Sequence, residues 1–178
     1  IISACYFYKA AQYPNNINLC EAGLFFRFDA TNILKKNLAS VVTSISKDHL
    51  DWLPKNEQTI EKIVFEKTSS LLNSNIIVAK QNSKETIDCI KKTISHNKSN
   101  KIYFNDNFSY SISENNFFYY EDKFGGLKLT KPNVRGQYQL ENISTAIATL
   151  RTLNLGVNDE HIKLGIQKIN NIARLQEI

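Results

Sequence analysis

The chain has 178 residues, of which 42% are hydrophobic and 22% charged, and its net charge at pH 7 is +5. This composition is ordinary for a soluble globular protein with one core. No apolar run approaches the roughly 20 residues of a transmembrane helix, and no signal-peptide pattern opens the chain, so we expect a cytoplasmic protein. The three cysteines are scattered without CxxC spacing, which argues against a disulfide framework and a zinc site.

The first expected elements are a helix and two strands. The helix lies near residues 2–11 and ends before Pro14. A strand is expected at residues 17–21, where alternate apolar side chains share one face and Glu21 takes the last place on it. The apolar, β-branched run at 38–45 is typical of a strand buried on both faces of a parallel sheet.

Helices and strands alternate in the rest of the chain, which indicates an α/β architecture. Aromatic-rich segments, split by a Gly-Gly pair, indicate short antiparallel strands. The clearest amphipathic pattern has apolar residues at steps of three and four. We expect, in order, a helix at 59–72, a strand at 75–79, a helix at 84–95, a strand at 101–104, antiparallel strands within 108–130, and helices at 139–153 and 159–169.

The predicted fold is therefore a mostly parallel sheet flanked by helices, with a small antiparallel β appendage. We expect residues 1–178 to form a single partial domain with a β-rich insert at about 101–131. The chain contains no Met, and Ile1 lies inside the first expected helix. Residues 173–178 likewise resemble the beginning of an element, so we expect segments to be missing at both ends.

Polar residues stand where two expected strands end. Ligands collect beyond the carboxyl ends of parallel strands, so Glu21 and the Asp48-His49 pair could converge there. A carboxylate suits Mg²⁺, whereas an imidazole is a less natural ligand for this cation. Taken singly, Glu21 could instead cap a helix and His49 could hydrogen-bond a backbone carbonyl.

Lys67 occupies an unusual place on its expected helix. It follows Ile60, Ile63 and Val64 at steps of seven, four and three, on the apolar stripe. A buried ammonium is costly, so the side chain must extend to solvent, pair with a carboxylate, lose its charge or be modified. The sequence predicts a lysine with a special environment but leaves these alternatives open.

Three blocks of sequence together resemble a known family. They are EAGLFFRFDATN at 21–32, SKDHLDWL at 46–53 and IEKIVFEK at 60–67. In order and residue type they are similar to the folylpolyglutamate synthase/dihydrofolate synthase family, a branch of the Mur-type ATP-dependent amide ligases. The resemblance implies the latter part of a Mur-ligase-type ATPase domain. It also implies ATP as co-substrate, Mg²⁺ as cofactor, and ligation of glutamate to folate or dihydropteroate through an acyl phosphate.

The resemblance implies roles for individual residues in these blocks. Glu21 and His49 match the two magnesium ligands of the family, and Lys67 matches a lysine that is carbamylated beside the metal. The stretch that contacts the pteroate substrate in bifunctional members matches Phe28, Asp29 and Ala30. Without the resemblance, Asp29 would be a turn or helix N-cap residue.

Two later residues match ATP contacts of the family. Asn142, in VRGQYQLENISTAIATL at 134–150, matches an ATP-contacting asparagine, with Tyr138 in place of the usual histidine. Arg174 matches an arginine that touches ATP phosphates. Taken singly, Asn142 would be a solvated residue in the first turn of a helix, and Arg174 would be a surface charge.

The chain also departs from the family pattern. Phe25 and Phe26 replace a glycine pair, where missing side chains let the backbone approach a ligand. The Ala-Gly-Ile expected after Lys67 is Thr-Ser-Ser, and no G-x-x-x-x-G-K-[ST] phosphate loop occurs in the sequence.

These departures leave two hypotheses. In the first, the chain works as part of a ligase, and neighbouring polypeptides supply the missing N- and C-terminal halves. In the second, it is a non-catalytic remnant or pseudogene product. A nucleic-acid-binding module would need a clustered basic stripe, which the sequence lacks, so we expect neither nucleic acid nor membrane as a partner.

Overall fold

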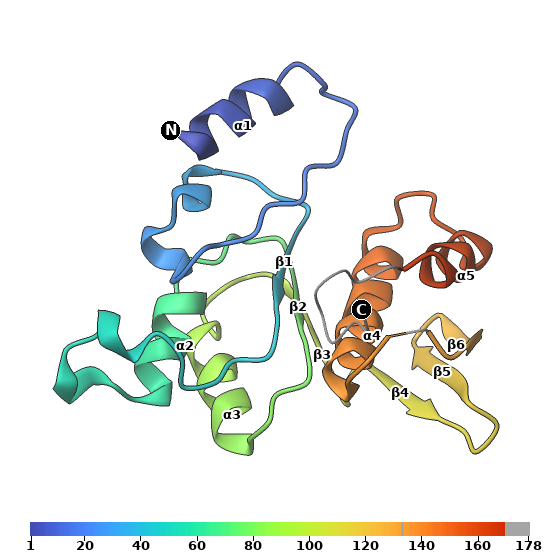
Figure 1. Cartoon of the computed structure of the whole chain (residues 1–178). Helices are drawn as coiled ribbons and strands as arrows, with labels where there is room; N and C mark the ends of the chain where they lie inside the picture. The colour runs from blue at the N-terminus through green and yellow to red at the C-terminus, as the bar shows by residue number, and fades with distance from the viewer. Residues whose placement is uncertain (133, 170–178) are drawn as a thin grey trace, which may run out of the picture.

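The computed structural model describes residues 1–132 and 134–169 (Figure 1). The helices are α1 (Ile2–Ala10), α2 (Ile60–Thr68), α3 (Lys84–Thr93), α4 (Gln137–Leu153) and α5 (Asp159–Gln167). The strands are β1 (Ala39–Val42), β2 (Asn75–Val78), β3 (Asn100–Tyr103), β4 (Phe108–Ile112), β5 (Phe117–Asp122) and β6 (Gly125–Thr130). The alternating helices and strands and the antiparallel segment expected from the sequence are thus confirmed.

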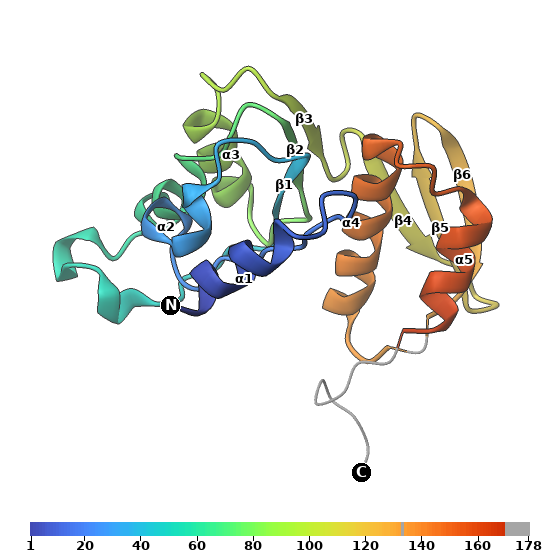
Figure 2. The same cartoon turned by 90° about the horizontal axis from the view of Figure 1, so that it is seen from above.

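The first sheet is parallel and has the strand order β1-β2-β3. Its central strand carries Ile76, Ile77 and Val78, all 0% exposed. Ile76 and Val78 pack with apolar side chains of α2 and α3, whereas Ile77 packs in a second cluster with α4. Because successive strand side chains point to opposite faces, α2 and α3 cover one face of the sheet and α4 the other (Figure 2).

Hydroxyl caps fix the start of both helices on the first face. The Thr59 side chain accepts a hydrogen bond from the Lys62 N–H at the start of α2. The Ser83 side chain accepts one from the Thr86 N–H at the start of α3. Each cap satisfies a backbone donor that a helix end leaves unpaired, so the positions of both helix starts follow from the local sequence.

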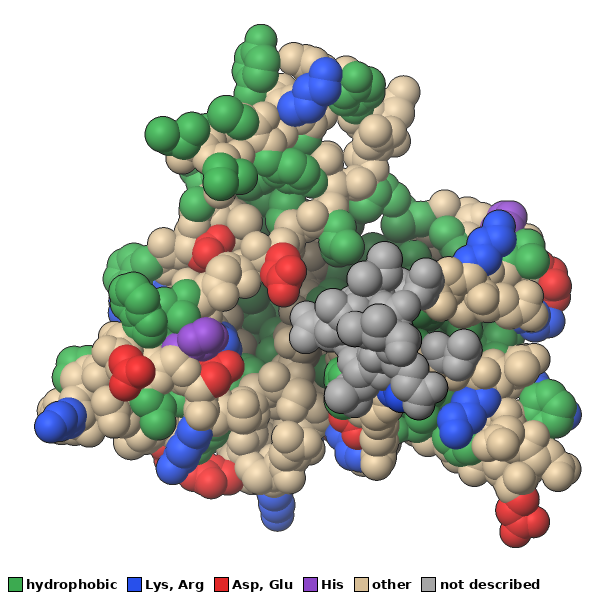
Figure 3. Space-filling view, viewed as in Figure 1, with side chains coloured by type: hydrophobic (Ala, Val, Ile, Leu, Met, Phe, Trp, Pro, Cys, Tyr) green, Lys and Arg blue, Asp and Glu red, His purple; other side chains and the backbone are tan. Residues whose placement is uncertain are grey.

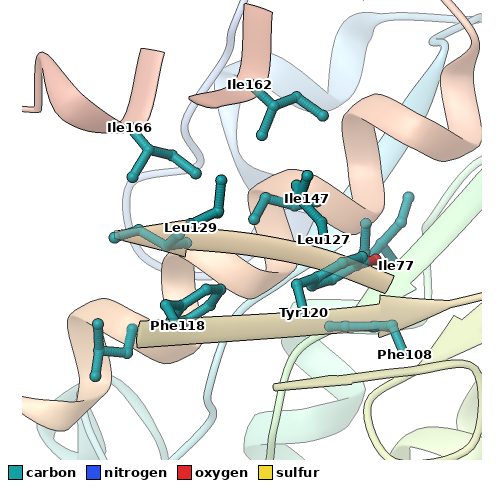
Figure 4. Packing of buried hydrophobic residues seen from close by; sticks show 12 residues of the cluster. Ile77, Phe108, Phe118, Tyr120, Leu127, Leu129, Ile147, Ile162 and Ile166 are labelled. Atoms are coloured by element: carbon teal, nitrogen blue, oxygen red, sulfur yellow. The ribbon is translucent and has the colours of Figure 1, made fainter. Parts of the chain in front are cut away.

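The second sheet is antiparallel, with the order β4-β5-β6. One of its faces is packed against α4 and α5. Phe118 and Tyr120 on this face join Ile147 of α4 and Ile162 of α5 in one buried cluster (Figure 4). Since the same cluster includes Ile77 of β2, α4 lies between the two sheets and is shared by both cores.

Two strand predictions are corrected. Residues 17–21 form no strand, because an extended segment needs a neighbouring strand to bond its backbone and no strand in the described part of the chain pairs with it. The strand expected at 38–45 shortens to β1, and it is not buried on both faces. Val42 is buried on the face that α2 and α3 cover, whereas Val41 on the opposite face is 45% exposed. Within residues 1–132 and 134–169, β1 is an edge strand and pairs with β2 alone.

The first helix makes little use of its apolar side chains. None of the α1 residues is buried. Hydrophobic side chains gather on the surface over this helix, at the top of the space-filling view (Figure 3). Large exposed side chains in and after α1 include Ile1, Ile2, Tyr8, Tyr13, Ile17 and Leu19. Among the helices of the described residues, none is long and apolar enough to cross a membrane.

Candidate functional site

The amine of Lys67 joins two loops at the end of α2. Its Nζ donates a hydrogen bond to the backbone oxygen of Leu24 at 3.3 Å and lies 3.6 Å from Oδ2 of Asp48. The side chain is 22% exposed, in keeping with its place on the apolar stripe of the helix. Of the alternatives that the sequence left open, the structure contains the pairing with a carboxylate.

His49 lies beside the same carboxylate. Its Nε2 is 3.8 Å from Oδ2 of Asp48, and its ring meets the Phe25 ring edge to face at 6.2 Å. The Phe25 ring is also 5.7 Å from Nζ of Lys67. The His49 backbone is left-handed, with φ 54° and ψ 29°, which is uncommon for a residue other than glycine. Such backbone conformations cluster at functional sites.

Glu21 does not join this group. The residue is exposed, and its carboxylate makes no ion pair or hydrogen bond with the described residues. The structure therefore brings His49 and Lys67 together around Asp48, whereas Glu21 lies at the surface on the same loop as Leu24. It caps no helix, because the nearest turn downstream begins at Phe26 with Phe25 as its cap.

The polar groups around Lys67 fit a magnesium ion that keeps water ligands better than a metal ion held by protein ligands alone. Within residues 1–132 and 134–169, no group of three or more His, Cys, Asp or Glu side chains could hold a metal. Oδ1 of Asp48 is buried and has no hydrogen-bond partner there, so this oxygen lacks a donor or cation. Magnesium needs only one or two protein carboxylates besides water and phosphate oxygens.

A buried ion pair fixes the loop that carries Leu24 and Phe25. The guanidinium of Arg27 donates two hydrogen bonds of 2.7 Å to the carboxylate of Glu66, from Nε and Nη2. Glu66 is buried in α2, directly before Lys67. The Arg27 guanidinium lowers the pKa of Glu66, although burial opposes this shift. This planar two-bond contact fixes both distance and orientation, so the loop is held against the last turn of α2.

The predicted substrate stretch begins directly after Arg27. The exposed Phe28 ring stacks on the Arg27 guanidinium at 4.1 Å. Asp29 accepts hydrogen bonds from the Gly23 N–H and from the N–H and hydroxyl of Thr31. Burial opposes ionisation of Asp29, but these hydrogen bonds outweigh it and lower its pKa. Asp29 is thus an N-cap, the structural alternative from the sequence, and it caps the turn Ala30–Ile33.

Of the two predicted ATP contacts, the structure describes Asn142, which lies on the α4 side of the first sheet. Asn142 is exposed in the second turn of α4, and Arg174 lies outside the described residues. The helix begins at Gly136, whose φ of 88° favours glycine. A side chain there would also meet the Tyr138 ring, since an added Cβ would lie 2.4 Å from a ring carbon. No contact joins Asn142 to the Lys67 group in the described chain.

Sequence reasoning missed two residues that build this site, Arg27 and Glu66, and it placed Asp48 at a strand end without a role of its own. Asp48 precedes His49 in the quoted block and ends in the centre of the group, so its position beside His49 was an available signal. Arg27 and Glu66 are 39 residues apart, and neither has a local pattern that indicates its partner. Only the fold, which sets the loop against α2, brings these two charges together.

Comparisons with known proteins relate the whole chain to one set of enzymes. It is 32% identical to the dihydrofolate synthase/folylpolyglutamate synthase of Escherichia coli over 168 residues, or 93% of this chain and 36% of the relative. The enzyme of the same name from Haemophilus influenzae is 28% identical over 180 residues, or 99% and 38%. The chain thus spans between a third and two fifths of these relatives. No family model matches it.

Solved structures extend the comparison. The apo form of L. casei FPGS superimposes with a TM-score of 0.83 at 22% identity, covering 99% of this chain and 44% of that one, which supports the fold. A structure of E. coli FolC in complex with DHPP and ADP gives a TM-score of 0.72 at 31% identity, covering 89% and 36%. Both sheets and the helices around them thus have counterparts within larger molecules.

Proposed function

We propose a function from one premise, that this chain belongs to the folylpolyglutamate synthase/dihydrofolate synthase family. The chain contributes a magnesium-binding and nucleotide-binding edge to an ATP-dependent ligase. That ligase joins glutamate to folate or dihydropteroate through an acyl phosphate. The substrate class is supported by the E. coli structure with DHPP and ADP and by an FPGS complex with AMPPCP and folate.

The convergence of His49, Asp48 and Lys67 carries this proposal. The His49 imidazole and the Lys67 amine, from two segments, both lie within 4 Å of Oδ2 of Asp48, beside the loop that carries Glu21. Bound Mg²⁺ would neutralise phosphate charge during phosphoryl transfer. Asp48, through its buried oxygen, and His49 are the groups placed to hold it, and Glu21 would join them only if its surface loop moved toward Asp48. Phe28, Asp29 and Ala30 would contact the pteroate part of the substrate, with Asn142 and Arg174 on the nucleotide.

The chain needs other polypeptide for this reaction. It has no phosphate-binding loop sequence. Its first sheet ends in the exposed edge of β1, and an apolar surface covers α1 nearby. Within the described residues, the side of β1 that faces away from β2 has no strand partner. Such an edge, with exposed apolar side chains around it, is a surface that a further strand and helix would bury. We therefore expect the segment with the phosphate-binding loop to dock on β1 and α1.

Calorimetry on the purified chain tests the metal and nucleotide part of the proposal. Mg²⁺-ATP should bind, and Glu21→Ala or His49→Ala should weaken binding by about tenfold or more. Glu114→Ala removes an exposed carboxylate from a hairpin turn of the second sheet and serves as the matched control. Equal binding by Glu21→Ala, His49→Ala and the control would contradict the assigned ligands.

Carbamylation of Lys67 has a separate test. Incubation with ¹³C-bicarbonate and Mg²⁺ should give a carbamate signal in the ¹³C NMR spectrum. The signal should be missing from Lys67→Arg, which keeps the charge but has no amine to carbamylate. A signal of equal strength in both proteins would mean that another amine, such as the N-terminus, reacts.

A non-catalytic chain remains the second candidate, and Phe25 favours it. Its ring packs against the core and fills space between His49 and Lys67, at a place where the family has glycine. A ring there leaves less room for a nucleotide phosphate. This candidate predicts no Mg²⁺-ATP binding by the natural chain and no ligase product after mixing with a polypeptide that carries the phosphate-binding loop. Recovery of binding in Phe25→Gly would identify the ring as the obstacle.

A further inference from the structure

A cavity lies on the α4 side of the first sheet, away from Lys67. It has a volume of about 650 Å³, within the range of roughly 300–1,000 Å³ typical of small-molecule sites. Its walls come from the ends of β2 and β3, from β4 and from the start of α4. The cavity thus sits beyond the carboxyl ends of two parallel strands, where ligands collect in such sheets.

One wall of the cavity is aromatic and aliphatic. The rings of Phe104 and Tyr110 lie 6.0 Å apart at 59°, and Leu140 of α4 lines the cavity with them. Tyr110 is held in place because its ring stacks on the buried Phe118 at 5.2 Å. Because these two half-buried rings are inclined to each other, a planar group of a ligand could stack on one of them and meet the other edge-on.

The other wall carries positive charge. The Lys131 ammonium has no ion-pair partner in the described part of the chain. Lys80 also lines the cavity, but its charge is balanced by Glu141 at 2.9 Å. Burial raises the pKa of the Tyr110 hydroxyl, so this group is protonated at neutral pH and can donate to an acceptor.

The start of α4 adds to this positive wall. Gly136 and Gln137, the cap and the first residue of the helix, both line the cavity. No side chain caps the helix here, and its first turn contains no acidic residue. The unpaired N–H groups and the positive end of a 17-residue helix favour an anion at this position.

We propose that this cavity binds a small organic anion, with a planar ring on Phe104 and Tyr110 and a carboxylate or phosphate facing Lys131 and the first turn of α4. The site is separate from the proposed metal and substrate residues, because none of them lines it. Asn142 also lies outside the cavity, although it is on the same helix. The proposal therefore does not depend on ligase activity of the chain.

Amide chemical shifts of the ¹⁵N-labelled chain test the proposal with four simple probes. Benzoate and phenyl phosphate should shift the amide signals of Asn105, Gln137 and Leu140 in a saturable way. Phenol, which lacks the charge, and inorganic phosphate, which lacks the ring, should each bind about tenfold more weakly or worse. The stronger of the first two probes identifies the anionic group as a carboxylate or a phosphate. Equal binding of phenol and phenyl phosphate would overturn the proposal.

A pair of lysine variants localises the charge. Lys131→Gln should weaken binding of the better probe about five- to tenfold. Lys128→Gln is the matched control, since Lys128 is exposed on β6, stacks over Phe117 and does not line the cavity. Equal loss in both variants, or no loss in Lys131→Gln, would contradict the assignment. Both substitutions lie at the surface, and unchanged thermal unfolding verifies that each variant folds.

Discussion

The two ends of this molecule contain similar kinds of side chain and use them differently. The segment from Ile1 to Phe25 is rich in isoleucine, leucine and aromatic residues, yet Leu19 is 94% exposed and α1 buries nothing. The segment from Phe108 to Ile166 has a comparable supply and buries Phe118, Tyr120 and Ile147 almost completely. Hydrophobic content is thus not sufficient for a core, because a second packed layer must be present to cover it.

The candidate site lies between the exposed N-terminal segment and the packed elements that follow it in the chain. On its buried side are α2 and the first sheet, where Glu66, Ile63 and Val64 are buried. On its exposed side is the loop that begins near Glu21. The Arg27–Glu66 pair joins the two, and the Phe25 ring of the same loop packs against the core beside it. The contrast between the two ends can be tested with substitutions, from the largest effect to the smallest.

The largest effect is expected for Phe118→Ala. This side chain is fully buried between α4 and the second sheet, so its removal should lower the free energy of unfolding by roughly 3–5 kcal/mol. Tyr8→Ala in α1 removes an exposed ring of similar size and should cost less than about 0.5 kcal/mol. Urea denaturation of both variants measures the difference. A comparable loss in both would show that α1 is packed in solution.

Glu66→Ala should have the next largest effect. It removes a buried carboxylate that holds Arg27, and loss of these charged hydrogen bonds should cost roughly 2–3 kcal/mol. Amide hydrogen exchange should also become faster at residues 22–29, which the pair attaches to α2. Glu61→Ala, an exposed carboxylate on the same helix, is the control. The Asn32 amide donates to the Arg27 backbone oxygen and to the Ser70 hydroxyl, and Lys67 donates to Leu24. Unchanged exchange in the loop would mean that these hydrogen bonds hold it without the ion pair.

Gly136→Ala should destabilise the chain by roughly 1–2 kcal/mol. The positive φ of this residue disfavours a side chain, and the new methyl group would meet the Tyr138 ring. Gly165→Ala is a matched control, because it adds a methyl group within α5 where no atom lies within 4 Å. Thermal unfolding distinguishes the two. If Gly136→Ala is as stable as the control, α4 can begin at a residue that carries a side chain.

The stability of the Arg27–Glu66 pair and its loop should also depend on pH. Arg27 lowers the pKa of Glu66, and hydrogen bonds lower that of Asp29 in spite of burial. For a carboxyl group with a lowered folded-state pKa, the added stability is fully present above the unfolded pKa. It is lost as the pH falls through the folded-state pKa. The free energy of unfolding should therefore decrease between about pH 5 and pH 2. Glu66→Gln should show a flatter profile, and an identical profile would exclude this pair as a cause.

The smallest effect is expected from deletion of residues 1–11. Because α1 contributes no buried residue, its loss should change the free energy of unfolding by less than about 0.5 kcal/mol. Binding of a hydrophobic dye should decrease, since exposed apolar side chains are removed. A large loss of stability on deletion would mean that α1 supports the first sheet, and that the contrast between the two ends is weaker than the structure indicates.

Much of the architecture could be predicted because it depends on local patterns. Steps of three and four located α4, and aromatic segments with a Gly-Gly pair located the second sheet. The starts of α2 and α3 lie within one residue of those expected, where hydroxyl side chains cap them. The strand expected at residues 17–21 was wrong for a nonlocal reason. Alternation describes which side chains share a face, but a strand also needs a partner for its backbone.

The sequence also placed Lys67 in an unusual environment and related Glu21, His49 and Lys67 to one chemistry. Which of them meet was decided by the tertiary structure: His49 and Lys67 share Asp48, and Glu21 makes no contact with either. The sequence by itself determined the order of helices and strands and the residue types available at each strand end, because these follow from local spacing. Only the fold decided that Arg27 reaches Glu66 and that α4 is shared by two sheets, because contacts between distant segments depend on how whole elements pack.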